Sequence, residues 1–485
     1  MPKLFATSIA VSFGTGLLVF CGQLSIAQTN LAALPLAPRA QLELHAQGAA
    51  PQDAMQPGTQ SAQAAQTMAP ASTPHGPVEA LTRQQAEQLA LRDNPRISVA
   101  ALLALAQRQV VRETRSAELP NLNGNLTGVD AEEASRISSG TLNASRLLYH
   151  AGAGVVLNQL ITDFGRTRNL VASSSLQAKA SEESSLATRS DIALAADLAF
   201  YRALEAQATL AVAQSTVNAR KEVSDQVSAL TASKLKSALD QSFAEVNLSQ
   251  AKLLALDAQN QYDAAIASLN EVLGANGGTQ FRLVDDAAPP VPIAASSGDV
   301  IAMALKRRPD LLALRDIHDA DISFAQAQHD QLLPTISGLA IVGVTPIGSS
   351  EYFPQNWYGA AGINIGIPIF NGFRYHAEAS EADLRAKAAA EQDRDLEDRI
   401  VRDVRTAWLT TATARQRMSV TAELLKEANT ALDLAQTRYN LGLSSIVELS
   451  QAQLQQTEAQ IDDANARFDY EADLAALRFQ AGSVP

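Results

Sequence analysis

The sequence predicts a mainly α-helical chain that also carries strands suited to a membrane β-barrel, organised as a tandem repeat. Roughly 89 of the 485 residues are alanine, whereas only 13 are Phe, 8 are Tyr and 2 are Trp. Two runs of about 66 residues, 165–231 and 374–439, contain no proline and no glycine in their interiors. We therefore expect long helices packed at close range rather than several cores filled by large side chains.

Composition and cysteine usage exclude several classes of function. The formal net charge is −13, so no excess of Lys and Arg is available to neutralise the phosphates of a nucleic acid. Cys21 is the single cysteine and the six histidines are scattered, which leaves neither a disulfide framework nor a zinc site. The sequence also lacks the glycine motifs of nucleophile elbows, phosphate-binding loops and dinucleotide-binding folds. We therefore expect no catalysis, no cofactor, no bound metal and no nucleic-acid partner.

The amino terminus is typical of a secretory signal. Residues 4–20 are mostly apolar, follow Lys3 and precede the small-x-small sequence Ser25-Ile26-Ala27. Residues 1–27 are therefore predicted to be a signal peptide that is cleaved after Ala27. The alternative is a lipoprotein signal in which Cys21 is lipidated, although Phe20 is bulky where such a signal carries a small residue. Residues 28–77 are rich in Ala, Gln, Pro, Ser and Thr, which predicts a disordered leader because they bury too little apolar surface to fold.

The two halves of the chain match each other in order. Asn94-Pro95-Arg96 is matched by Arg308-Pro309-Asp310, 214 residues later. Asp163-Phe164-Gly165-Arg166 is matched by Asn371-Gly372-Phe373-Arg374, and from there the spacing stays at 208 residues. Matches that recur in order at constant spacing indicate a tandem duplication. The predicted organisation is repeat 1 over residues 78–285, a linker over 286–295 and repeat 2 over 296–485.

Four short stretches alternate between residue types as β-strands do: 121–129, 155–162, 336–344 and 358–369. The last stretch has one apolar face and one small or polar face. The apolar face would meet either the core of a soluble sandwich or the lipid around an outer-membrane barrel. Trp357 and Tyr358 lie at one end like an aromatic girdle, which favours the barrel. The two faces are Ala361, Ile363, Ile365, Ile367 and Ile369, and Gly362, Asn364, Gly366 and Pro368.

The remaining segments predict helices. At 1.5 Å per residue, each long run would extend for about 100 Å, which suits a coiled coil or the wall of a tube rather than a globular domain. Small residues recur every three or four positions, as in Ala195, Ala199 and Ala203, and allow close approach of neighbouring helices. Shorter helices that would stack along the long ones are expected near residues 96–117, 239–273, 311–331 and 446–479.

In this order, the elements resemble the outer membrane efflux protein family of TolC-like channels. The resemblance covers about 400 residues, which is everything after the leader. Each motif that carries it is loose on its own, and their order within two matching halves makes the likeness specific. The motifs are Arg308-Pro309-Asp310, Leu333-Pro334, Phe370-Asn371-Gly372, and Tyr439-x-x-Gly442 leading into Ser445-x-x-Glu448.

The resemblance implies a homotrimer that forms one tube in the outer membrane and the periplasm. Four strands from each chain would close a 12-stranded β-barrel surrounded by outer-membrane lipid, and the helices would continue it as a long periplasmic α-helical barrel. Family members act as passive exit ducts of tripartite efflux pumps or of type I secretion systems. Their partners are a periplasmic adaptor (membrane fusion) protein and an inner-membrane pump. The motifs do not identify the cargo, which can be a drug, a metal or a protein.

The resemblance also places a gate at the periplasmic tip, where each long helix turns into a returning one. Tyr439 corresponds to the family's gate tyrosine and Glu448 to its ring-forming acid, with Asp240 as the matching acid of repeat 1. Ser444 replaces a gate arginine and Gln451 a second ring aspartate, so the closing contacts cannot be transferred. The expected constriction therefore comprises Asp240, Tyr439, Glu448 and Gln451. The expected adaptor contacts are Ser233, Lys234, Leu235, Leu441, Gly442 and Leu443.

Alternatives remain for the residues and for the whole chain. Asp240 and Glu448 could be acids of a first helical turn that interact with their own helix dipole, and Tyr439 could be a packing residue at a helix end. The alternative function is a periplasmic coiled-coil structural or adaptor protein without a pore. An adaptor normally carries one helical hairpin in a compact β-domain. This chain repeats a hairpin together with two apolar-faced strands, which favours the duct.

Overall fold

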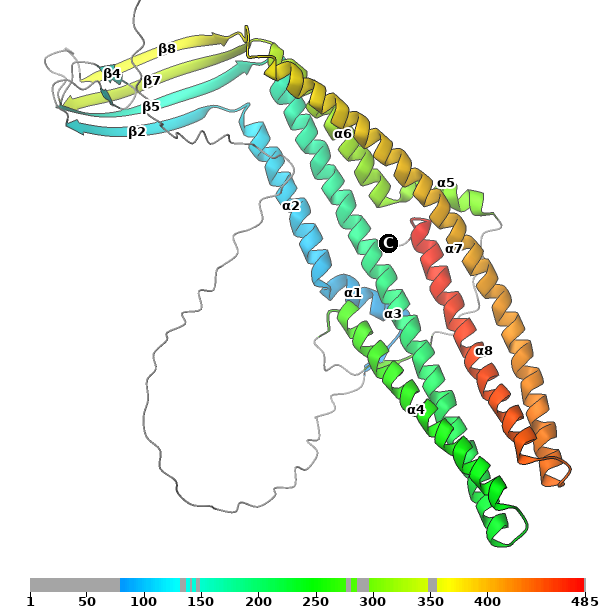
Figure 1. Cartoon of the computed structure of the whole chain (residues 1–485). Coiled ribbons are helices and arrows are strands. Elements are labelled where there is room, and N and C mark those ends of the chain that lie inside the picture. The colour runs from blue at the N-terminus through cyan, green and yellow to red at the C-terminus, as the bar shows by residue number, and fades with distance from the viewer. Residues whose placement is uncertain are drawn as a thin grey trace, which may run out of the picture. The chain divides into compact units, whose positions relative to one another are not determined.

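The computed structural model describes residues 79–130, 137–139, 142–144, 149–275, 281–285, 296–347 and 356–483. All of them belong to one compact unit. The predicted signal peptide (1–27), leader (28–77) and linker (286–295) lie outside the described residues. Figure 1 shows the described part as a β-sheet at one end and long helices that run from it toward two hairpin tips.

Four strands form one antiparallel sheet. They are β2 (Asn121–Asp130), β5 (Tyr149–Thr162), β7 (Thr335–Ile347) and β8 (Trp357–Gly366), hydrogen-bonded in the order β2-β5-β7-β8. The sheet therefore joins a pair of strands from each half of the chain between β5 and β7. Two further pairs are short: β1 (Glu79–Leu81) is parallel to β6 (Phe281–Leu283), and β3 (Ile137–Ser139) is antiparallel to β4 (Leu142–Ala144).

The helices form two long hairpins with shorter helices beside them (Figure 1). α3 (Arg166–Ala232) turns into α4 (Ala238–Val272), and α7 (Arg374–Asn440) turns into α8 (Ile446–Gln480). α3 and α7 have 67 residues each, and α4 and α8 have 35 each. The shorter elements are α1 (Arg83–Asp93), α2 (Pro95–Ser116), α5 (Ser297–Arg307), α6 (Pro309–His329) and the 3-10 turn η1 (Asp330–Leu332). No helix in the described ranges is both long and apolar enough to cross a membrane.

The sequence located the hairpin helices closely. The expectations for α3, α4, α7 and α8 are confirmed to within one residue at each end. Ser237 and Ser445 cap the starts of α4 and α8 and mark these boundaries locally. The helix expected over 96–117 is α2, and the one expected over 311–331 is α6 followed by η1. Two helices, α1 and α5, were not predicted, because each spans only 11 residues and shows its apolar period for three turns at most.

Three strand boundaries differ from the prediction by three residues or more. The strand predicted over 336–344 extends to Ile347. The strand predicted over 358–369 ends at Gly366, so Ile367 and Ile369 do not belong to its apolar face. Pro368 explains this end, because proline has no N–H to donate to a strand ladder. The strand predicted from residue 155 begins at Tyr149, in a stretch of alternating Ala and Gly whose small side chains give little hydrophobic signal.

Two apolar clusters hold the short elements against the long helices. The first contains Phe200 of α3, which is 1% exposed, and Leu269 of α4. The second packs Ile400 of α7 against Leu311 of α6 and Leu477 of α8. Outside these clusters most of the buried apolar residues of the hairpin helices are alanines, which lets neighbouring helices approach closely.

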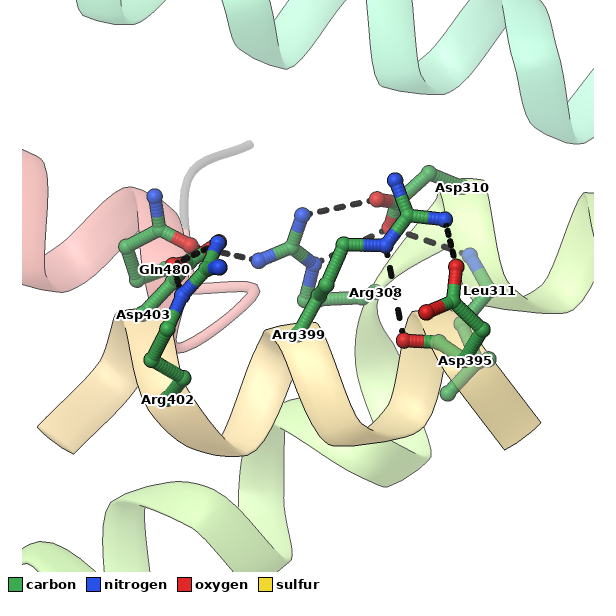
Figure 2. A network of polar contacts seen from close by, with 8 residues as sticks. All are labelled: Arg308, Asp310, Leu311, Asp395, Arg399, Arg402, Asp403 and Gln480. Atoms are coloured by element: carbon green, nitrogen blue, oxygen red, sulfur yellow. Dashed lines mark hydrogen bonds and ion pairs between the residues drawn. The ribbon is translucent and has the colours of Figure 1, made fainter. Parts of the chain in front are cut away.

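The Arg308-Pro309-Asp310 motif joins three helices (Figure 2). Arg308 lies at the N-cap of α6, and its guanidinium donates two hydrogen bonds to Asp310, at 3.0 and 2.7 Å. A third nitrogen donates to Oε1 of Gln480 at the end of α8, at 2.5 Å. On the neighbouring α7, Arg399 is paired with Asp395 of its own helix. The motif therefore connects the α5–α6 junction to the carboxyl end of α8.

Candidate functional site

The four-stranded sheet has one apolar face and one mixed face. The register pairs Val155 with Val342, and Gly338 with Ile363, so these residues share a face. Leu126 on that face is 88% exposed and Ile363 is 70% exposed. A large exposed apolar surface of this kind is typical of strand faces in contact with lipid. The other face carries polar side chains among apolar ones, and these are Asn121, Asn123, Asn125, Asn158, Ser337 and Asn364.

Both edges of this sheet are open within the described part of the chain. β2 pairs only with β5, and β8 pairs only with β7. Each edge therefore presents a row of backbone N–H and C=O groups that need partners in a hydrocarbon environment. Four strands are too few to close into a barrel on their own. Strands from other copies of the chain can supply the hydrogen-bond partners that both edges lack.

The two hairpin turns share one backbone design. The amide of Leu235 donates to the carbonyl of residue 230 at 2.8 Å, and the amide of Leu443 donates to that of residue 438 at 2.9 Å. These bonds close Schellman motifs, which place a left-handed residue just before them. That residue is Gly442 in the second turn (φ 71°) but Lys234 in the first (φ 61°). Lys234 is strained there, because its Cβ approaches the following carbonyl oxygen.

Replacing Lys234 with glycine is expected to strengthen the first turn. The left-handed conformation costs a residue with a side chain about 1–2 kcal/mol. Glycine avoids this cost, but its larger backbone entropy in the unfolded chain offsets roughly half of the benefit, so the net gain in stability is about 0.5–1 kcal/mol. Hydrogen exchange of the Leu235 amide should therefore become a few-fold slower. Ser233→Gly, at a right-handed position, is the control and should make this exchange faster. Faster exchange in Lys234→Gly would contradict the strain.

The two acids expected at the constriction each occupy the third position of their helix. Asp240 Oδ2 accepts hydrogen bonds from the amide and the hydroxyl of Ser237, the N-cap of α4, at 3.1 and 2.8 Å. The Glu448 amide donates to Ser445 Oγ at 3.3 Å, and Glu448 Oε1 lies 3.2 Å from Nε of Arg438. Both carboxylates thus take part in helix capping or hairpin closure. Among the described residues, no group of three or more His, Cys, Asp or Glu is placed to hold a metal ion.

Tyr439 joins the two hairpins. Its side chain is 5% exposed and belongs to an apolar cluster with Val227 of α3 and Ala244 of α4. Nζ of Lys236, from the first turn, lies 4.1 Å from the centroid of the tyrosine ring, which is a cation–π contact. Burial raises the pKa of Tyr439, and the charge of Asp240 raises it further. The phenol therefore stays neutral and acts as an anchor between the hairpins.

The other predicted residues lie on the surface of the tip. Leu235, Leu441 and Leu443 are 72%, 68% and 69% exposed, and Ser233 and Gly442 are exposed beside them. Gln451 is exposed on α8. Asp240 lies close enough to Tyr439 for its charge to raise the pKa of the phenol.

Sequence reasoning missed two residues of this site, Lys236 and Arg438. Lys236 could not be found, because its contact with Tyr439 crosses from one hairpin to the other. Arg438 had a local signal, since it ends α7 just before the turn that begins the helix of Glu448. A further link was also missed: Nδ2 of Asn247 on α4 donates to Oγ of Ser450 on α8 at 2.6 Å.

Comparison with known proteins finds one family model, described as outer membrane efflux protein, which matches residues 53–275 and 300–483. The chain is 27% identical over 383 residues to outer membrane protein OprJ of Pseudomonas aeruginosa, covering 75% of this chain and 76% of OprJ. It is 23% identical over 408 residues to outer membrane protein TolC of Escherichia coli, covering 80% and 79%. Among solved structures, CusC aligns with a TM-score of 0.73 at 20% identity, covering 82% of this chain and 92% of CusC. VceC of Vibrio cholerae aligns with a TM-score of 0.70 at 17% identity, covering 82% and 96%.

Proposed function

We propose that this chain, which belongs to the outer membrane efflux protein family, forms a passive exit duct. The curated relatives OprJ and TolC are outer membrane proteins, and this chain is likewise an outer-membrane efflux channel. Its proposed place is the outer-membrane component of a tripartite efflux pump or of a type I secretion system. Cargo would pass through it unchanged, and no chemical step is assigned to its residues.

The proposed assembly is a homotrimer whose twelve strands close one β-barrel in the outer membrane, continued by an α-helical barrel in the periplasm. The observation that carries this proposal is a four-stranded sheet with an exposed apolar face and two open edges. Pairing β8 of one copy with β2 of the next satisfies both edges, and the apolar face then meets lipid. In a single chain, both sheet edges would lack hydrogen-bond partners and the barrel would not close.

We also propose the organisation expected from the sequence: a signal peptide over 1–27, a leader over 28–77, and two repeats over 78–285 and 296–485. Left-handed residues 208 positions apart support the two repeats. Gly274 and Gly482 end the returning helices with φ angles of 68° and 66°. Lys234 and Gly442 occupy the same place in the two hairpin turns.

The proposed partners at the periplasmic end are an adaptor protein and, through it, an inner-membrane pump. The exposed leucines of the two turns, Leu235, Leu441 and Leu443, give the tips a small apolar surface. Such a surface on a tight turn suits docking against another helical protein. Ser233, Lys234 and Gly442 complete the proposed contact.

The proposed gate is the contact between the two hairpin tips around Tyr439, with Asp240, Glu448 and Gln451 near the opening. The Arg438–Glu448 pair closes its own hairpin, whereas the Lys236–Tyr439 contact joins two hairpins. Only the second contact has to break when the hairpins move apart. Lys236 also lies 208 residues before Ser444, so the first turn carries the positive charge that the second turn lacks.

The test of this gate is Lys236→Met, which is expected to open the duct more often. Loss of a cation–π contact worth about 0.5–2 kcal/mol should raise the open probability several-fold, measured as single-channel conductance of the purified protein in planar bilayers. Lys236→Arg keeps a cation over the ring and should behave like the parent. An unchanged open probability in Lys236→Met would remove this gate. A purified chain that is a soluble monomer without conductance would favour the pore-free coiled-coil protein.

A further inference from the structure

Arg220 is a buried cation in the middle of the α3–α4 hairpin. Its side chain is 8% exposed, and Nη1 is fully enclosed without a hydrogen-bond partner in the described part of the chain. No ion pair of Arg220 occurs among the described residues. Burial lowers the pKa of this guanidinium, yet arginine remains charged at any physiological pH. A positively charged group therefore has one nitrogen enclosed within the protein without a hydrogen-bond partner.

The position of Arg220 is set by contacts on either side of it along α3. Val227, seven residues later, packs in one cluster with Ala244 of α4 and Leu449 of α8. Thr209, eleven residues earlier, has its Oγ1 3.4 Å from Oδ1 of Asn465 on α8. Seven and eleven residues are about two and three helical turns, so all three side chains lie on one face of α3. Arg220 thus faces the seam where the first hairpin meets the second.

The acids near this level of the seam point away from it. Glu222 and Asp225 of α3 are exposed, as is Glu458 of α8. Glu245 of α4 is also exposed and accepts a hydrogen bond from Gln241 of its own helix. The antiparallel course of α3 and α8 instead sets Arg220 level with two buried neutral residues, Gln453 and Thr457.

The corresponding place in the second hairpin holds a neutral residue. Position 428, which follows Arg220 by the 208-residue spacing, is an alanine that is 8% exposed. Alanine at such a position allows close helix packing without any cost of desolvation. A largely buried, unpaired charge, in contrast, opposes the packed state, because its enclosed nitrogen regains hydration only when the helices separate.

We propose that Arg220 weakens the packing of α3 against α8 and so sets how readily the two hairpins separate. The proposal rests on the proposed function in one respect, namely that separation of the hairpins opens the duct. Arg220 is a positioning residue in this scheme, since it touches neither cargo nor partner. Neutral packing residues hold the closed tip together, and Arg220 keeps that closure reversible.

Hydrogen exchange of the α8 amides between residues 446 and 460 tests the proposal on the full-length protein. Arg220→Met keeps a long side chain and removes the charge, and should slow this exchange roughly ten-fold, because the packed state loses its desolvation cost. Lys221→Met removes an exposed charge from the next residue and is the matched control, which should match the parent. Exchange in Arg220→Met that is unchanged or faster would overturn the proposal.

A charge partner placed across the seam gives a second test. Gln453→Glu should slow exchange in the parent, where Arg220 pairs with the new carboxylate, and should accelerate it in Arg220→Met, where the carboxylate is buried alone. Equal effects in the two backgrounds would overturn the proposal. Planar-bilayer recordings separate it from the gate: slower exchange with an unchanged open probability would uphold the role of Arg220 and count against gating at the tip.

Discussion

Replacing Ile363 with arginine is expected to prevent assembly of the protein in the outer membrane. Ile363 is 70% exposed on the apolar face of β8, where the proposed barrel meets lipid. An arginine on the lipid face of a barrel costs about 2–4 kcal/mol near the membrane midplane, and a homotrimer would carry the residue three times, so the folded oligomer in the outer-membrane fraction should fall by roughly ten-fold or more. The measurement is the amount of detergent-resistant oligomer in that fraction.

Asn364→Arg is the matched control for this prediction. Asn364 follows Ile363 in the same strand, is also exposed, and points to the opposite face of the sheet. In the proposed barrel that face lines the lumen, where a charged side chain keeps its water, so assembly should stay near the parent level. Failure of Asn364→Arg alone would mean that the two faces are reversed. Equal assembly of both variants would remove the lipid-facing assignment.

A second large effect is expected from Gly274→Ala, at the end of α4. Gly274 has a φ angle of 68°, and a Cβ added there would lie 2.7 Å from the backbone oxygen of Asp93 at the end of α1. The left-handed conformation, less the gain in backbone entropy, costs about 0.5–1 kcal/mol, and displacement of the α1–α2 junction adds to it, so a loss of about 2–3 kcal/mol is expected. The measurement is the denaturant midpoint of the full-length protein.

Gly442→Ala separates the two contributions to that loss. Gly442 has nearly the same φ angle, 71°, but a Cβ added there meets nothing within 4 Å. Its substitution should therefore cost only the conformational part less the gain in backbone entropy, about 0.5–1 kcal/mol. If the two substitutions lowered stability equally, the close approach of α4 to the α1–α2 junction would carry no energetic weight.

The hairpin helices were predictable because residues close in sequence determine their boundaries. Gly442, Ser445 and Glu448 end one helix and begin the next within a few positions, and each acts through hydrogen bonds to nearby backbone. The end of β8 had an equally local signal in Pro368, which the alternation of isoleucines outweighed in the prediction. The short helices α1 and α5 also begin at local signals, the Thr82–Gln85 capping box and the Ser296 N-cap, but their 11 residues show the apolar period for too few turns to be recognised.

The contacts of the site residues could not all be predicted from neighbouring residues in the sequence. Tyr439 was expected at the gate, but its partner Lys236 lies 203 residues away in the chain and reaches the ring only because the two hairpin tips pack together. Asp240 and Glu448 were expected at the constriction, and each has a partner in its own hairpin. Arg220 looks like an ordinary surface arginine in the sequence, and only the packing of α3 against α4 and α8 buries it.

Helix lengths, turn chemistry, strand faces and family membership follow from this chain's residues without coordinates, because each depends on residues a few positions apart or on their order. The surroundings of each charged side chain cannot be inferred from neighbouring residues in the same way. Whether a charged side chain is buried, contacts the neighbouring hairpin or faces a pore depends on how far it is from water and from opposite charges. Those distances are fixed only when helices remote in sequence pack together. The contact of Lys236 with Tyr439 and the burial of Arg220 can therefore be recognised only in the folded chain.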